Sequence, residues 1–155
     1  MKLQSSPLRA LGLLGLLLAI PARAETANCS LLKPADVAKL LGGAVTERQN
    51  GGACIWTGPG SKRKLVVARM QATGAPAERA YDSARAYAAK AGADKVIEEP
   101  GMADKAFSVQ TSAGVTLVAL KQGRLIQLKY TTEVAGTPRE VEALRPVARK
   151  ALAVF

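Results

Sequence analysis

The sequence predicts an α+β fold in a single domain, with about three helices packed on a mostly antiparallel sheet and one disulfide. Three observations support this prediction. Segments with helical periodicity separate runs of strand-like segments, in the order helix, two or three strands, helix, four strands, helix. The links between the last three strands are only two or three residues long, which forces antiparallel hairpins. The 155 residues suit one domain better than two.

The first 24 residues are expected to be a secretory signal peptide, outside the folded domain. Two basic residues precede Leu11 to Ile20, an apolar run of ten. As a helix this run would reach about 15 Å, roughly half the hydrocarbon core of a bilayer. Small residues at 22 and 24 match what signal peptidase reads, so we expect cleavage between Ala24 and Glu25. The mature α+β domain would then comprise 25–155.

The predicted mature chain is basic. The whole sequence has 22 Lys and Arg against 12 Asp and Glu, and the leader holds three of the basic residues, which leaves a net charge of +7. No second apolar run is long enough to span a membrane, so we expect a periplasmic or secreted protein with no membrane span after cleavage. A positive surface would attract an anionic envelope component, an interaction that salt weakens, or would merely keep the protein soluble.

Cys29 and Cys54 are the only cysteines, and both follow the leader. In an oxidising compartment they most simply form one disulfide. This bond would join residues 25 apart in the sequence and add about 3 to 4 kcal/mol of stability in the chain-entropy model. A redox pair or a metal site is the alternative, but the cysteines are far apart and the chain has no histidine. We therefore predict a structural bond, with no metal and no cofactor.

The first helix is predicted over 34–41. Pro34 suits its first turn, Asp36 complements its positive end, and Gly42 follows its last residue. Alternation and flanking turn residues then place the first strands. They are a ragged edge strand within 44–52, a strand over 53–57 and a strand over 64–72.

A second helix is predicted over 76–92, where alanines recur at helical spacing and form a smooth stripe able to sit close on a sheet. The strand from Val115 is apolar on both sides and should lie inside the sheet, whereas the last strand alternates and should be half exposed. Thr137 to Glu140 forms a capping box that opens the final helix. The strands of this half are 95–99, 105–111, 115–121 and 124–132.

Four short motifs carry a resemblance. They are Cys29-Ser30-Leu31-Leu32, Leu41-Gly42, Cys54-Ile55-Trp56 and Gly101-Met102-Ala103-Asp104-Lys105-Ala106-Phe107. Together the motifs resemble a family of small bacterial cell-envelope proteins of unknown function, which includes secreted proteins and lipoproteins. The chain departs from this family at Ala103, where glycine is usual, and it lacks a lipid-attachment site. The resemblance implies an envelope location and a similar shape, and the family has no established activity to transfer.

The absence of histidine removes the Ser-His-Asp and Cys-His mechanisms and the usual catalytic zinc sites. Ser30 and Lys33 match the Ser-x-x-Lys pattern of penicillin-recognising enzymes, but the companion motifs are missing. Glu98, Glu99 and Asp104 are the one local cluster of acids, and a hydrolase that works with carboxylates alone would need such a cluster. A cap of the turn before the Lys105 strand is the simpler interpretation of Asp104.

A basic hairpin is the candidate ligand-binding surface, made of Trp56, Lys62, Arg63, Lys64 and Arg69. A second basic strip lies on the final helix, at Arg145, Arg149 and Lys150. Six aromatic residues are too few for a nucleic-acid surface of interleaved aromatic and basic residues. For Trp56 itself we favour core packing against Cys54, with a rim residue that anchors a ligand as the alternative.

The sequence therefore predicts a non-enzymatic secreted or periplasmic module of unknown ligand, able to bind an anionic envelope component. A protein-interaction module, such as an inhibitor or an assembly factor, is the alternative, using a sheet edge or a basic strip. A carboxylate-dependent hydrolase is the third hypothesis.

Overall fold

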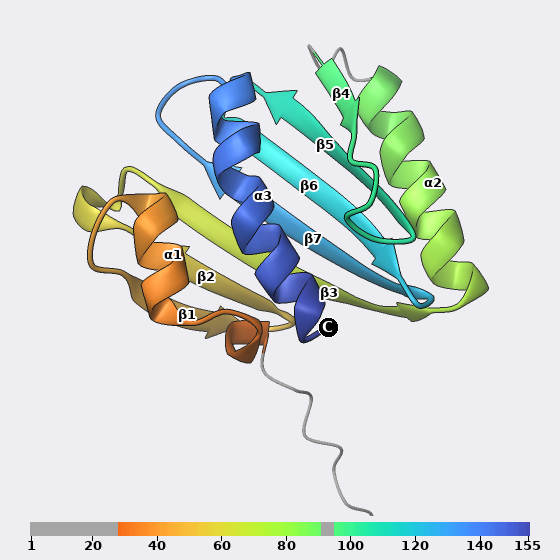
Figure 1. The fold of residues 1–155 in the computed structure, drawn as a ribbon, viewed down its shortest axis with the longest axis horizontal. Coiled ribbons are helices and arrows are strands. Elements are labelled where there is room, and N and C mark those ends of the chain that lie inside the picture. The colour runs from red at the N-terminus through yellow and green to blue at the C-terminus, as the bar shows by residue number, and fades with distance from the viewer. Residues whose placement is uncertain (1–27, 91–94) are drawn as a thin grey trace, which may run out of the picture.

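Seven antiparallel strands form one sheet in the spatial order β1-β2-β3-β7-β6-β5-β4 in a computed structural model, which describes residues 28–90 and 95–155 (Figure 1). The strands are β1 (Thr46–Asn50), β2 (Ala53–Thr57), β3 (Lys64–Thr73), β4 (Lys95–Glu98), β5 (Lys105–Thr111), β6 (Gly114–Lys121) and β7 (Arg124–Thr131). The predicted α+β fold is confirmed. The predicted signal peptide and its cleavage site at Ala24 and Glu25 lie outside the described residues.

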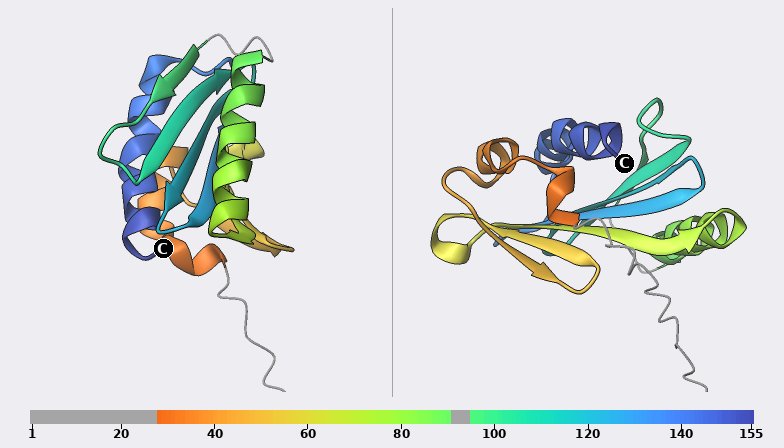
Figure 2. Two further views of the ribbon diagram at one scale, coloured as in Figure 1. Left: turned by 90° about the vertical axis from the view of Figure 1, so that its right-hand side faces the viewer. Right: turned by 90° about the horizontal axis from the view of Figure 1, so that it is seen from below.

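Helices cover both faces of the sheet (Figure 2). The helices are α1 (Pro34–Leu41), α2 (Ala75–Lys90) and α3 (Pro138–Ala153), with short 3-10 turns at η1 (Asn28–Leu31) and η2 (Pro59–Ser61). α1, α3 and η1 lie on one face, called here the α1/α3 face, and α2 lies on the opposite α2 face. The predicted bounds of the first helix match α1. The last two residues predicted for the second helix, 91 and 92, lie outside the described residues.

Each face of the sheet has its own apolar cluster. The larger cluster lies under α1 and α3 and includes Trp56, Leu65 and Leu128 from three different strands. The smaller one lies under α2, where Tyr81 meets Phe107 edge to face with the ring centroids 5.4 Å apart. The alanine stripe predicted for this helix is present, with Ala77 and Ala88 buried. Alternate residues of β5, β6 and β7 serve the two clusters, as the two-residue period of a strand requires.

The interior of the sheet follows the predicted pattern. β6 lies between β7 and β5 and is buried on both faces, as the apolar run from Val115 indicates. β7 is the middle strand, and it alternates between buried Leu128 and Tyr130 and exposed Gln127 and Lys129. Its partner β3 is distant in the sequence, and the two pair from Lys64–Thr131 onward.

The predicted disulfide joins Cys29 of η1 to Cys54 of β2, with the two Cα atoms 4.9 Å apart. Cys54 is completely buried in the cluster beneath α1 and α3. The bond therefore fastens the start of the described chain to the sheet, and such bonds persist in oxidising compartments. Within the described residues, no helix combines the length and apolar character needed to cross a membrane.

A close backbone approach sets where α3 begins. The Gly136 N–H donates to the Thr111 carbonyl at 2.8 Å, and a Cβ atom on Gly136 would lie 2.0 Å from the Gly114 oxygen. Only glycine fits so near to another backbone. One residue later, Thr137 N–H donates to the Glu140 carboxylate at 3.0 Å, which is the Glu140 half of the predicted capping box.

Candidate functional site

The structure disperses the five residues predicted to form one ligand surface. Trp56 is only 1% exposed and belongs to the core, so the rim interpretation of this residue is wrong. Lys62, between η2 and β3, forms an ion pair at 3.6 Å with Glu133, which follows β7, and both side chains are exposed. Lys64 and Arg69 are five residues apart on β3 and therefore point to opposite faces of the sheet.

Arg69 contacts the C-terminal residue. Its guanidinium lies 4.9 Å from the ring centroid of Phe155, and Arg124 lies 5.0 Å from the same ring. Cation–π contacts of this kind contribute about 0.5 to 2 kcal/mol each. Arg69 and Arg124 thus both pack on the Phe155 ring, and the Arg69 Nε is buried there with no hydrogen-bond partner among the described residues.

The three acids proposed for a hydrolase all line one hollow of about 640 Å³ beside α2, but each of them already has a partner. Glu98 pairs with Arg85 of α2 on the α2 face. Glu99 faces α3, where Arg145 Nε donates to its carboxylate at 2.7 Å. Asp104 accepts a hydrogen bond from the Gln122 backbone N–H at 2.6 Å. Asp104 thus caps the turn that joins β6 to β7, and not the turn before the Lys105 strand for which it was predicted.

Glu99 is the most deeply placed of these acids, with a side chain that is 4% exposed. The Ser108 hydroxyl also donates to it, at 2.9 Å, and Arg145 reaches both of its oxygens. Arg145 in turn contacts exposed Glu142 one turn earlier on α3. The predicted basic strip on this helix is therefore divided. Arg145 pairs with buried Glu99, whereas Lys150 pairs with Asp36 of α1.

A groove between α1 and α3 gathers basic side chains from α1, from α3 and from the segment before β3. Its volume is about 490 Å³, within the usual range for ligand pockets. We call it the α1–α3 groove, and its lining consists of Asp36, Lys39, Leu40, Arg63, Tyr130, Arg139, Glu140, Ala143, Pro146, Val147 and Lys150. Of the predicted ligand residues, only Arg63 lines this groove.

Arg63 enters the groove at the end of α1. A Cβ atom on Gly42, which caps α1 in the left-handed conformation, would lie 3.4 Å from Arg63 Nη1. A cation is stabilised there, because the carbonyl end of a helix is partly negative. The Tyr130 side chain, from the middle strand, lies at the base of the groove, and its hydroxyl donates to the Leu40 carbonyl at 3.5 Å, a long hydrogen bond.

Both acids of the groove already have partners. The hydrogen bond from Lys150 lowers the pKa of Asp36, against the effect of burial. The hydrogen bond with the Thr137 side chain lowers the pKa of Glu140 in the same way. Burial raises the pKa of Tyr130, which keeps its hydroxyl protonated and able to donate. Lys39, Arg63 and Arg139 are left as basic groups without an ion pair among the described residues, so the groove can accept an anion.

The Asp36–Lys150 pair predicts a specific pH dependence. A carboxyl whose pKa is lowered by folding stabilises the protein above its unfolded pKa, and this contribution is lost as the pH falls through the folded value. The wild type should therefore lose stability below about pH 4, and Asp36→Asn should lose less over the same range. Urea unfolding between neutral and acidic pH measures the two slopes. Arg149→Gln is the matched control and should keep the wild-type slope; equal slopes for Asp36→Asn and the wild type would contradict the pairing.

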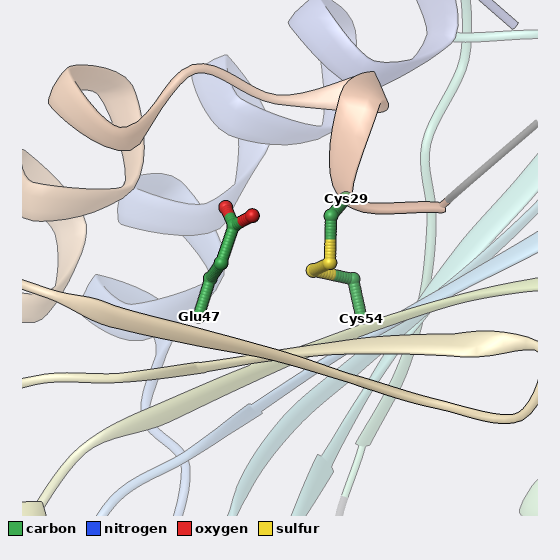
Figure 3. Close-up of side chains that lie close together, drawn as sticks. All are labelled: Cys29, Glu47 and Cys54. Carbon is green, nitrogen blue, oxygen red and sulfur yellow. A yellow bond between two sulfur atoms is a disulfide. The ribbon is translucent and has the colours of Figure 1, made fainter.

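One further cluster has the residue types of a metal site. The ligand atoms of Cys29, Glu47 and Cys54 lie within 4.8 Å of one another (Figure 3). The two sulfurs are bonded to each other, whereas a metal requires thiolates. This cluster is therefore a disulfide beside an exposed carboxylate.

The groove was only partly accessible to sequence reasoning. Arg63 belongs to a visible basic run, but Lys39 and Arg139 are single charges on two helices separated by about 100 positions, with no local signal linking them. Their approach depends on the packing of α1 beside α3. In comparisons with known proteins, no family model, no curated protein and no solved structure matches this chain.

Proposed function

We propose that this protein is a non-enzymatic, exported binding module whose α1–α3 groove takes an anionic component of the cell envelope. The observation that carries the proposal is the convergence of Lys39, Arg63 and Arg139 on one hollow in which both acids are already partnered. An anion placed there would meet unpaired positive charge without displacing an existing ion pair.

Phosphate or carboxylate groups suit this arrangement. Arginine presents a planar fork of donors that matches both groups, and the groove offers two arginines. The long hydrogen bond of Tyr130 leaves its hydroxyl free to turn to a ligand oxygen at little cost. Leu40 and Val147 add apolar wall, so the ligand class is an anion with a carbon skeleton.

Two triple variants with the same loss of charge test the proposal. Lys39→Gln, Arg63→Gln and Arg139→Gln together neutralise the groove. Arg48→Gln, Lys64→Gln and Lys129→Gln together neutralise exposed cations that lie on β1, β3 and β7, away from the groove.

We expect the groove variant to bind soluble glycerol phosphate and phosphatidylglycerol vesicles about tenfold more weakly, since each exposed pair contributes up to about 1 kcal/mol. The control variant should bind glycerol phosphate like the wild type, and high salt should weaken all binding. Binding would be measured by isothermal titration and vesicle sedimentation. Equal losses in the two variants would show that total charge alone attracts the anion, and the groove would then have no special role.

A further inference from the structure

The α2 face of the sheet is only half covered. α2 contacts β4, β6, β7 and the end of β3 from which it starts. The β1–β2 hairpin carries η1 on one side, and no described helix lies on its other side (Figure 2). β1 and β2, with Lys64–Ala68 of β3 and Gln127–Thr131 of β7 beside them, thus present an open surface next to α2 that is separate from the groove.

Strand register defines the residues of this surface. Arg48 lies opposite Ile55, Ile55 opposite Val66, and Val66 opposite Lys129, so these four form one row across the strands. The rows on either side are Thr46, Thr57, Lys64 and Thr131, and Asn50, Ala53, Ala68 and Gln127. We call these twelve residues the open sheet face.

The open sheet face is positive with an aliphatic centre. Arg48, Lys64 and Lys129 are exposed, none of them has an ion pair among the described residues, and the other nine positions include no acid. Ile55 and Val66 are half-buried side by side between the cations. The surface would therefore complement an element with an apolar stripe and acidic flanks.

Size and charge together select the occupant. Four strands span about 14 Å between the outer pair, and a helix with its side chains is about 10 to 12 Å wide, so the surface holds one helix. On the same sheet face, α2 shows how such a helix packs, through alanines and Tyr81. A second copy of this chain would bring like charges together, which opposes self-association through this face.

We propose that the open sheet face binds an acidic amphipathic helix of a partner protein, laid beside α2 on the same side of the sheet. Apolar burial over Ile55 and Val66 would contribute affinity, and pairing of glutamates with Arg48, Lys64 and Lys129 would set orientation and rate. This binding is independent of an anion in the α1–α3 groove.

The test uses an 18-residue helical peptide with an alanine–leucine stripe flanked by glutamates, titrated into the isotopically labelled protein. We expect saturable shifts of the amide signals of Ile55, Val66 and Lys129. The triple variant Arg48→Gln, Lys64→Gln, Lys129→Gln should bind about tenfold more weakly, and the groove variant Lys39→Gln, Arg63→Gln, Arg139→Gln should bind like the wild type. Both variants change exposed side chains, and a thermal melt verifies that they fold.

Three results would overturn the proposal. Shifts that map to the groove would place the peptide at the other basic site. Polyglutamate binding as tightly as the helical peptide would make the surface one for anionic polymers. No saturable shift would leave the face as the ordinary solvated side of an antiparallel sheet. Because the glycerol phosphate test reads the groove alone, failure of either proposal leaves the other intact.

Discussion

Arg145→Met should lower the free energy of unfolding by about 3 kcal/mol or more, the largest loss that we expect from one substitution. The variant leaves the Glu99 carboxylate, which is 4% exposed, with the Ser108 hydroxyl as its one remaining described partner. Leaving one buried charge without its counter-charge lowers the stability by far more than the intact ion pair raises it, because nothing then offsets the hydration that the charge has lost. Urea unfolding at neutral pH measures the loss.

Two further variants test whether the loss comes from the buried Glu99–Arg145 ion pair or from other contacts of α3. Glu142→Gln removes the other partner of Arg145. The Glu142 side chain is 68% exposed, so this variant should lower the free energy of unfolding much less. Combining Glu99→Met with Arg145→Met removes both charges and should be more stable than Arg145→Met alone. If Arg145→Met and Glu142→Gln lost the same amount, the buried ion pair would not be what stabilises this part of α3.

Removal of the disulfide is the second large effect. Cys29→Ser combined with Cys54→Ala should lower the free energy of unfolding by about 3 kcal/mol, and the melting temperature by roughly 10 °C. Alanine is chosen for the second site because Cys54 is completely buried, and a serine hydroxyl would have to be desolvated there. Calorimetry of the wild type with and without reductant, and of the variant, measures the effect.

The reduced wild type and the double variant should melt together, since both lose the same cross-link between η1 and β2. Reductant should leave the variant unchanged, which controls for effects of the reductant itself. Equal melting temperatures for oxidised and reduced wild type would show that the bond is not a stabilising element of this fold.

The Glu99–Arg145 ion pair and the Cys29–Cys54 disulfide each stabilise an element that borders one of the proposed binding surfaces. The Glu99–Arg145 pair ties α3, one wall of the α1–α3 groove, to the segment after β4. The disulfide ties η1, just before α1, to β2 of the open sheet face. Loss of either should loosen a binding surface without removing any of its charges, so binding assays on Arg63 or Lys64 variants need a stability measurement beside them.

The sequence already contains part of the evidence that the predicted ligand residues do not form one surface. Once 64–72 is a strand, its two-residue period already sends Lys64 and Arg69 to opposite faces. The burial of Trp56 was the favoured one of two interpretations, and it required knowing that η1 and α1 cover this part of β2. The partners of Glu99 were out of reach, because Ser108 and Arg145 lie 9 and 46 positions away.

Local sequence patterns are enough to predict the parts of the fold that neighbouring residues control. Short links such as Gln122-Gly123 force hairpins, Pro34 and Gly42 bound α1, and the two cysteines form one bond. No local pattern predicts that β3 pairs with β7, that α2 covers half of one face, or that Lys39, Arg63 and Arg139 meet. Those outcomes depend on contacts between distant segments, whose free energies come from burial and are not encoded in any local pattern.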